Sequence, residues 1–403
     1  MGNLENWSRI NLFEPTIDGH RARYASEILL GIRQRYPNCN LRLCIFDSQR
    51  CTPGYQEFLT PLEHTFEYCP LPERRSDGRF VGEWVRLKLL RYALTHFPCD
   101  ELILPYGDGI VPLMGLLPKW ILRWYVPEKV RIESMLFRPE WAYPSTNLLA
   151  SCYHRFRRWA VCRWPGDRLH FSDFSAWRRS VEGIDKYTAE VSLMPEVFEP
   201  WQLSDRKNAL QWLTQEGYLT RNQSERLQSL EVIGAPGLPS RRKGTVELIQ
   251  AFCMASEMSG MLVIWGQIPQ KVIKELRLRK VQWQDDTRII VLERYIPEKA
   301  FRALLSITDV VALPYQSHLG GVSSLFLLAA IFRLKTICDG RAWLGWAAEH
   351  YRHGLAIDST DIALLSNSLK TILAGGEVPV ASEQIAKELR SETTEGGFRG
   401  KWC

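Results

Sequence analysis

The sequence lacks the long apolar runs and the paired cysteines that mark several common classes of protein. No apolar run reaches the roughly 18 to 20 residues that a helix needs to cross a bilayer, and residues 1–5 do not begin a signal peptide. Its 10 cysteines form no CxxC pair, so we expect no metal site. Several cysteines, Cys44 among them, lie in apolar runs, and we expect buried free thiols in a reducing cytoplasm.

A strong excess of one charge is also absent. The 403 residues include 51 Lys and Arg against 45 Asp and Glu, a formal net charge of +6 that does not by itself indicate nucleic acid. The hydrophobic share of 45% is that of an ordinary globular protein. At roughly 100 to 200 residues per domain, the length predicts two domains.

Short apolar runs alternate with helical patterns along both halves of the chain. We expect strands at 10–13, 41–46, 66–71, 101–104, 130–136, 230–233, 261–265, 288–292, 310–313 and 336–338, and helices at 22–36, 80–96, 245–258, 298–306 and 325–332. The alternation predicts parallel sheets covered by helices. It breaks near 195–204, where we place the boundary between domains 1–200 and 201–403.

A glycine-rich basic loop, residues 234–244, lies between an expected strand and an expected helix. It begins at Gly234 and contains Arg241, Arg242 and Lys243. Free backbone N–H groups and the positive end of a helix dipole suit a phosphate there, and the cations suit a diphosphate leaving group. No Gly-Lys-Ser/Thr follows at the spacing of a Walker A loop, and the residues alone fit a solvated basic turn equally well.

A second loop, residues 313–324, also follows a strand and precedes a helix. It contains Gly320, Gly321, Ser323 and Ser324. Glycines allow the backbone to approach an anion and the serines supply hydroxyl donors. The alternative is a flexible turn without a ligand.

In sequence order, the features of residues 231–358 resemble the C-terminal domain of the retaining glycosyltransferases of family 4. The shared features include Lys243-Gly244 opening a helix, a strand ending at Gly266, and an Asp-Val-Val strand ending at Pro314. The other matching segments are 233–234, 295–298, 320–324, 328–330, 336–337 and 354–358. The resemblance is close over this region and loose over the rest of the chain.

The resemblance implies an α/β protein of GT-B fold, with two Rossmann-like domains facing each other across a cleft. The C-terminal domain would bind a nucleotide-diphosphate sugar, and Gly19 would close the site from the N-terminal domain. The N-terminal domain would bind a saccharide or lipid-linked saccharide acceptor in polysaccharide or glycoconjugate synthesis, and transfer would retain the anomeric configuration. Such an enzyme needs no metal when basic side chains and helix dipoles stabilise the departing diphosphate.

Three residues of the first half are candidates for catalysis or positioning. His20 lies in the loop after the first strand, and Glu133 and Arg138 flank the end of an expected strand. For each of them the alternative is a polar surface residue on a loop.

The sequence departs from the family at its paired glutamates. Gly320 and Leu328 occupy the two positions, and the family's arginine after the first strand of this domain falls near Ala235, so that Arg241 or Arg242 would have to replace it. An inactive GT-B protein that binds a saccharide or acts as a scaffold is therefore an alternative, as is a nucleotide-sugar epimerase of the same fold.

Residues 153–164 contain four arginines and two tryptophans. Such a stretch either lies on an anionic membrane surface, which suits a lipid-linked acceptor, or packs as an amphipathic helix with a solvated face. No nucleic-acid module accompanies it, so we expect no nucleic acid partner. The expected location is the cytoplasm, including the inner face of the membrane.

Overall fold

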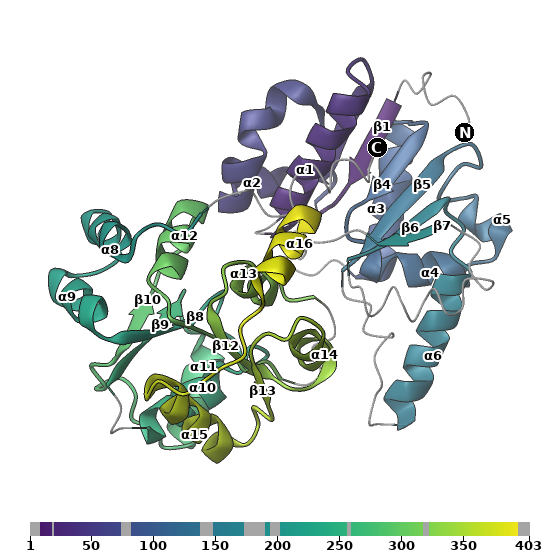
Figure 1. Cartoon of the computed structure of the whole chain (residues 1–403). Coiled ribbons are helices and arrows are strands. Elements are labelled where there is room, and N and C mark those ends of the chain that lie inside the picture. Colours follow the sequence, from purple (N-terminus) through teal and green to yellow (C-terminus); the bar gives the residue numbers. More distant parts are fainter. Residues whose placement is uncertain are drawn as a thin grey trace. The chain divides into compact units, whose positions relative to one another are not determined.

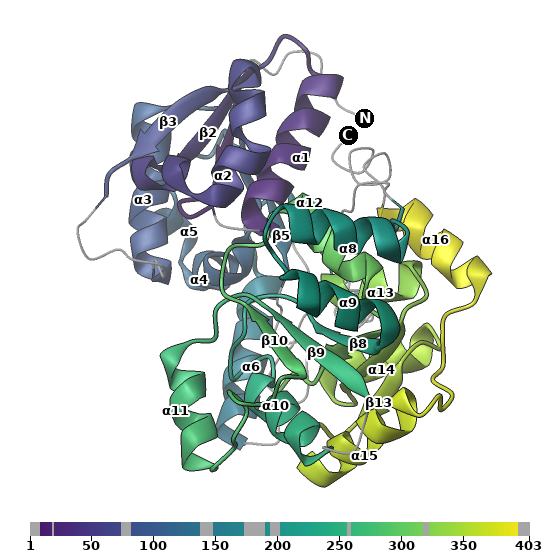
Figure 2. The same cartoon turned by 90° about the vertical axis from the view of Figure 1, so that its left-hand side faces the viewer.

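The structure of this protein is a computed structural model that describes residues 9–17, 20–73, 82–137, 148–172, 190–193, 202–255, 259–316 and 322–393. The chain divides into two compact units, Met1–Glu199 with Glu392–Cys403, and Pro200–Ser391. Each unit is built around its own parallel sheet with helices on it (Figure 1, Figure 2).

The first unit contains a seven-stranded sheet in the order β3-β2-β1-β4-β5-β6-β7. The strands are β1 (Arg9–Phe13), β2 (Asn40–Phe46), β3 (Glu67–Leu71), β4 (Glu101–Leu104), β5 (Arg131–Leu136), β6 (Arg168–Phe171) and β7 (Glu190–Leu193). Leu102 and Leu104 of β4 join one hydrophobic cluster while Ile103 joins another. Alternate residues of a strand point to opposite faces, so apolar side chains cover this sheet on both sides.

The helices of the first unit connect these parallel strands. They are α1 (His20–Arg35), α2 (Pro53–Phe58), α3 (Glu83–His96), α4 (Val111–Leu116), α5 (Lys119–Leu122) and α6 (Leu148–Cys162), with short 3-10 turns η2 (Asp47–Cys51), η3 (Thr60–Thr65) and η4 (Gly107–Gly109). Most of the basic and aromatic stretch at residues 153–164 belongs to helix α6, which packs on α4.

The second unit contains a six-stranded sheet in the order β10-β9-β8-β11-β12-β13. Its strands are β8 (Glu231–Ala235), β9 (Gly260–Trp265), β10 (Ile289–Leu292), β11 (Val310–Leu313), β12 (Lys335–Asp339) and β13 (Leu355–Ile357). Its helices are α8 (Arg206–Gln215), α9 (Arg221–Ser229), α10 (Thr245–Met254), α11 (Gln270–Leu278), α12 (Glu298–Ser306), α13 (Ser324–Ile331), α14 (Ala342–His350), α15 (Ile362–Leu373) and α16 (Glu383–Thr393).

The expected strands and helices are confirmed wherever the structure describes them. Strands 101–104 and 310–313 and helix 298–306 have the predicted bounds, and the other elements differ by up to a few residues at their ends. Parts of two expected helices, 80–81 and 256–258, lie outside the described residues. None of the helices in the described part of the chain has the length and apolar character to span a membrane.

Candidate functional site

The order of strands in the second unit places two loops next to each other. Chain order runs outward from β8 in one direction and from β11 in the other, so the sheet reverses between these neighbours. In parallel sheets, ligands bind at the carboxyl ends of the strands at such a reversal. Residues 236–244 follow β8 and residues 314–316 follow β11, so the described parts of both predicted ligand loops start at this point.

The side-chain ammonium group of Lys243, a residue of the first loop, lies between that loop and Tyr315 of the second. Its Nζ lies 5.6 Å from the centre of the Tyr315 ring and donates a hydrogen bond of 3.5 Å to the carbonyl of Pro236. A Cβ at Gly237 would clash with the same Nζ. The ammonium group therefore folds back over its own loop at the carboxyl ends of β8 and β11, where a cation can meet a diphosphate.

Two glycines allow the loops to approach this closely. Gly244 has φ of 68°, and a Cβ there would clash with the carbonyl oxygen of Pro314. Gly266 follows β9 with φ of 111°, and a Cβ would meet Pro239 at 3.3 Å. Residues with a Cβ rarely adopt such angles, so both positions favour glycine for conformation, and Gly244 needs it for space as well. Packing and backbone conformation thus explain Gly266, and its predicted contact with the donor stays a prediction.

Gly234 has a comparable packing constraint inside β8. A Cβ at this position would lie 2.7 Å from Oγ1 of Thr308, at the end of the helix that precedes β11. The residue therefore lets β8 pack against that connection. Its predicted contact with the donor stays a prediction.

The second loop leads into α13 through Ser323. Its hydroxyl, 7% exposed as a residue, accepts a hydrogen bond of 3.4 Å from the backbone N–H of Phe326 and so caps the helix. Ser324 is the first residue of α13. Because α13 follows a strand of a parallel sheet, we expect the free N–H groups of its first turn to lie near the carboxyl end of β11. Gly320 and Gly321 lie outside the described residues.

Arg241 and Arg242 occupy different surroundings although they are neighbours in the chain. Nη2 of Arg241 donates to Glu275 of α11 at 3.3 Å, and Glu275 also receives a hydrogen bond of 2.8 Å from Arg279. The carbonyl of Arg242 accepts a hydrogen bond of 2.9 Å from Gln316, which joins the two loops. Arg241 would have to leave Glu275 to reach a phosphate beside Lys243.

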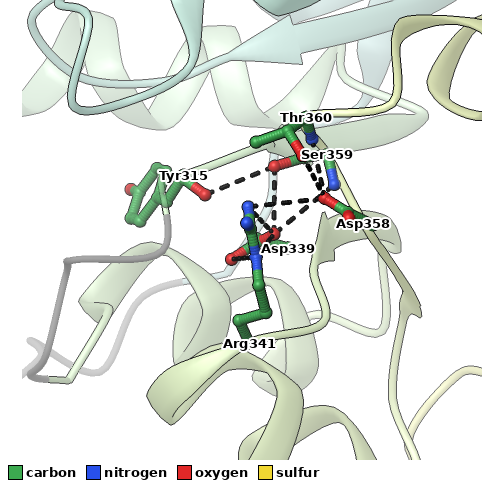
Figure 3. Close-up of polar contacts among 6 residues, drawn as sticks. All are labelled: Tyr315, Asp339, Arg341, Asp358, Ser359 and Thr360. Carbon is green, nitrogen blue, oxygen red and sulfur yellow. Dashed lines mark hydrogen bonds and ion pairs between the residues drawn. The ribbon is translucent and has the colours of Figure 1, made fainter. Parts of the chain in front are cut away.

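A further polar cluster lies at the ends of β12 and β13 and was not predicted as a site (Figure 3). Arg341 Nη2 lies 2.7 Å from the buried carboxylate of Asp339 and 3.6 Å from that of Asp358. The Ser359 hydroxyl lies 3.0 Å from Asp339 and 3.3 Å from the carbonyl of Tyr315. Through Ser359, the cluster holds the backbone of Tyr315, whose ring lies beside Lys243.

One signal in the sequence could have found this cluster. Asp339, Gly340 and Arg341 come directly at the end of an expected strand, as the two predicted loops do.

Hydrogen bonds from Thr360 lower the pKa of the exposed Asp358 carboxyl, so this carboxyl is ionised at neutral pH.

The first unit has its own reversal, between β1 and β4. Glu14 follows β1 and is 1% exposed, with Arg21 Nη1 at 3.0 Å and Arg86 Nη1 at 3.6 Å. Burial raises the pKa of Glu14, and the two arginines oppose that shift. Arg21 also lies over the ring of Tyr106, 4.7 Å from its centre. The sequence alone did not distinguish Glu14, because its partner Arg86 is far away along the chain.

The three candidate catalytic residues of the first unit lie at different places. His20 is the first residue of α1, while Gly19 and Arg138 lie outside the described residues. Glu133 is inside β5, three residues before its last residue, and its side chain is buried. The structure does not bring Glu133 to the end of its strand, and the catalytic roles of all three stay predictions.

Glu133 belongs to a buried network on the sheet. Its carboxylate lies 3.3 Å from Arg168 and 3.7 Å from His170, both on the neighbouring β6. Burial acts to raise its pKa, but His170 and Arg168 outweigh it and lower the pKa. Burial, together with the negative charge of Glu133, raises the pKa of Glu101 to about 9. The two carboxylates therefore hold one negative charge between them at neutral pH.

Nothing within the described ranges gathers three or more His, Cys, Asp or Glu side chains in a geometry that could hold a metal ion. The cysteines described, Cys39 through Cys338, are free thiols, and five of them are buried.

The fold is similar to that of solved glycosyltransferase structures, although the sequence matches no protein-family model and no curated protein. Sucrose-phosphate synthase from Thermosynechococcus elongatus superposes with a TM-score of 0.67 at 13% identity, covering 98% of this chain and 97% of that one. Anabaena HepE in complex with UDP and glucose gives 0.63 at 12% identity, covering 98% of both chains.

A third structure, α,α-trehalose 6-phosphate synthase from Burkholderia multivorans, gives a TM-score of 0.64 at 13% identity over 98% of this chain and 95% of that chain. At this identity the likeness concerns the fold. Because it extends over both parallel sheets and nearly the full length of each chain, this protein has the GT-B fold.

Proposed function

We propose that this protein is a glycosyltransferase that transfers a sugar from a nucleotide-diphosphate sugar to a saccharide or lipid-linked saccharide. The observation that carries the proposal is the position of Lys243, between the loops that follow β8 and β11 at the reversal of the sheet. Among the structures of similar fold, HepE binds UDP and glucose or UDP-glucose, and two others are sugar-phosphate synthases.

In this proposal the donor diphosphate lies between the two loops. Lys243 neutralises it, and the backbone N–H groups at the start of α13, with Ser323 and Ser324, donate hydrogen bonds to it. Arg241 and Arg242 supply further charge, and Gly234, Gly266, Gly320 and Gly321 let the backbone approach the donor. No metal is needed, because these groups stabilise the leaving diphosphate.

The first unit would bind the acceptor and close over the donor through Gly19, with His20, Glu133 and Arg138 as candidates for catalysis or positioning. Transfer would retain the anomeric configuration. We place the protein in polysaccharide or glycoconjugate synthesis in the cytoplasm, with residues 153–164 as a contact to the membrane that carries a lipid-linked acceptor.

A thermal-shift screen against UDP, GDP, ADP, CMP and their sugars tests the donor site. A ligand at ~100 times its dissociation constant adds about 2.7 kcal/mol to the free energy of unfolding. We expect one nucleoside diphosphate to stabilise the protein and Lys243→Ala to abolish that effect.

Lys207→Ala is the matched control, since it removes the same charge from an exposed lysine of α8 that has no role in the proposed site. This variant should keep the full ligand-induced shift. A screen in which no nucleotide stabilises the wild type would refute the donor site, and equal loss in both variants would refute the specific role of Lys243.

One observation favours the inactive alternative. Leu328, at the position of the second family glutamate, is 6% exposed and lies in α13, whose residues from Leu325 to Ile331 are all buried and apolar. No carboxylate can therefore reach a donor from this position. A protein that is stabilised by a donor sugar but neither hydrolyses it nor transfers it to any saccharide would be a binding or scaffold protein.

A further inference from the structure

Helix α6 exposes an unusual number of large apolar side chains. Leu148 and Leu149 are 79% exposed, Tyr153 54%, and Phe156 and Trp159 51% each. An exposed leucine alone needs no explanation, but contiguous apolar surface indicates a binding site for a partner or a membrane.

These side chains lie on one side of the helix. The spacing of Leu149, Tyr153, Phe156 and Trp159 is four, three and three residues, which places them in a row along it. The opposite side contains the half-buried His154 and Arg157 and the buried Val161. The row ends at the buried Ala160, where α6 packs on α4 and a Cβ at Gly115 would clash with the carbonyl of Ala160. The apolar row therefore points away from the core of its unit.

Positive charge flanks the row. Helix α6 contains Arg155, Arg157 and Arg158 and no acidic residue, and Arg163 follows it. The Arg163 guanidinium lies over the ring of Trp159, 4.9 Å from its centre. Arg157 is directed inward and pairs with Glu83 at 3.1 Å, which ties the helix to α3. Arg155 is exposed beside the row.

The helix also projects from its unit. Figure 1 shows α6 running away from α4, so its first turns lie beyond the rest of the first unit. The most exposed residues of the row, Leu148 and Leu149, are in those turns. An apolar row of this length can enter a flat surface without rearrangement of the unit.

We infer that α6 binds an anionic lipid bilayer by lying in its interface, with Leu148, Leu149, Phe156 and Trp159 among the acyl chains and Arg155 and Arg163 at the phosphates. Tryptophan and arginine at the boundary of an apolar face are typical of such helices. The charge selects an anionic surface, because each arginine near it strengthens binding. This inference deepens the membrane contact of the proposed function and does not depend on the donor site.

Co-sedimentation with vesicles tests it. We expect the full chain to bind vesicles of phosphatidylcholine with phosphatidylglycerol and to bind pure phosphatidylcholine at least tenfold more weakly. Arg155→Gln with Arg163→Gln should lower binding to the anionic vesicles roughly 25-fold, about fivefold for each charge. Phe156→Ser with Trp159→Ser should reduce binding at least tenfold.

The matched control is Leu278→Ser, which removes a leucine that is 83% exposed on α11 of the other unit and should leave vesicle binding unchanged. Stabilisation by the nucleoside diphosphate, measured in all variants, should stay at the wild-type value, which also shows that they are folded. Failure of vesicle binding with intact nucleotide binding would refute this inference alone.

The alternative partner for the apolar row of α6 is another protein molecule. If the wild type does not bind anionic vesicles but forms a dimer that Phe156→Ser with Trp159→Ser dissociates, the row is a protein interface and the lipid inference is wrong. Equal binding of all variants to the vesicles would also overturn it.

Discussion

At the scale of single residues, Gly244 and Gly217 form a natural pair. Both have φ of 68°, but a Cβ at Gly244 would clash with the carbonyl of Pro314, whereas a Cβ at Gly217 meets nothing within 4 Å. The left-handed conformation costs about 1 to 2 kcal/mol for a residue with a Cβ. Gly217→Ala should lose about that much, and Gly244→Ala about 2 kcal/mol more, because its loops must separate.

Urea unfolding of the two variants measures the difference, and nucleotide stabilisation measures its effect on the site. Gly244→Ala should weaken that stabilisation while Gly217→Ala leaves it unchanged. Equal losses of stability would show that the close approach of the two loops does not exist in solution.

The buried carboxylates give a prediction about pH. Because burial and Glu133 raise the pKa of Glu101 from 4.5 to about 9, the folded protein keeps a proton that the unfolded chain releases. This difference in proton binding at Glu101 therefore lowers the free energy of unfolding as pH rises from about 4.5 to about 9. Glu101→Gln removes it, so the stability of the variant relative to the wild type should rise with pH across this range.

The comparison is made by urea unfolding at pH 5, 7 and 8.5. Glu133→Gln is the companion variant, since it removes the ionised partner of Arg168 and His170 and should destabilise by about 3 kcal/mol at neutral pH. Because the charge of Glu133 helps to raise the pKa of Glu101, this variant should also weaken the pH dependence. A Glu101→Gln variant whose relative stability does not change with pH would contradict the shared-proton arrangement.

The sequence could predict those site residues whose neighbours along the chain mark them. Lys243 and Ser323 lie in loops that follow strands, just before the start of a helix, and that position is readable along the chain. The contacts of Lys243 with Tyr315, and of Arg341 with Asp358, join segments at the ends of strands that are adjacent only in the folded sheet. A single sequence does not contain these pairings.

At the scale of elements, strong periodicity was predictive. Strand 310–313 and helix 298–306 were predicted to the residue because buried runs alternate there with amphipathic spacing. Strand β6 (Arg168–Phe171) was missed because its four residues include an arginine and a histidine, whose partner Glu133 is 35 residues away. Helix α16 was missed although its spacing is amphipathic, because only a few apolar side chains, Ala386 and Leu389 among them, form its buried face between many charged residues.

The buried His353, which follows α14, connects β12 with the segment before α16. Its Nδ1 accepts a hydrogen bond of 3.2 Å from the backbone N–H of Ala381, before α16, so Nε2 carries the proton that bonds to Thr336 of β12 at 2.9 Å. Burial lowers its pKa from 6.5 to about 4. The unfolded chain takes up a proton below pH 6.5 that the folded protein refuses, so stability is lost as pH falls from about 6.5 toward about 4.

Between pH 7 and pH 5 this single group should account for about 2 kcal/mol of lost stability. His353→Gln does not titrate, so the variant should show a smaller loss over the same range, whatever its stability at pH 7. Urea unfolding of both proteins at the two pH values gives the difference. Parallel curves for wild type and variant would show that His353 is not held neutral.

At the scale of the whole molecule, the sequence predicted two α/β sheets because the same rhythm starts again after a break. It did not predict the order of the strands, since chain order alone does not say that β4 returns beside β1 or β11 beside β8. Those two adjacencies create the reversals at which Glu14 and Lys243 lie. The site is therefore a product of topology acting on loops that the sequence already marks.

Because the two units have separate hydrophobic cores, calorimetry can assign the donor site to one of them. We expect two unfolding transitions, of which the nucleoside diphosphate from the screen raises only one. At pH 8, Glu101→Gln should raise the other, because Glu101 belongs to the first unit.

If nucleotide and Glu101→Gln move the same one of two transitions, the donor binds to the first unit and the assignment to Lys243 is wrong. A single transition that responds to both would mean that the units unfold together. Hydrogen exchange then decides, because donor binding at Lys243 must protect the backbone N–H groups of residues 236–244 and of the start of α13, while those around Glu14 change only if the donor lies there.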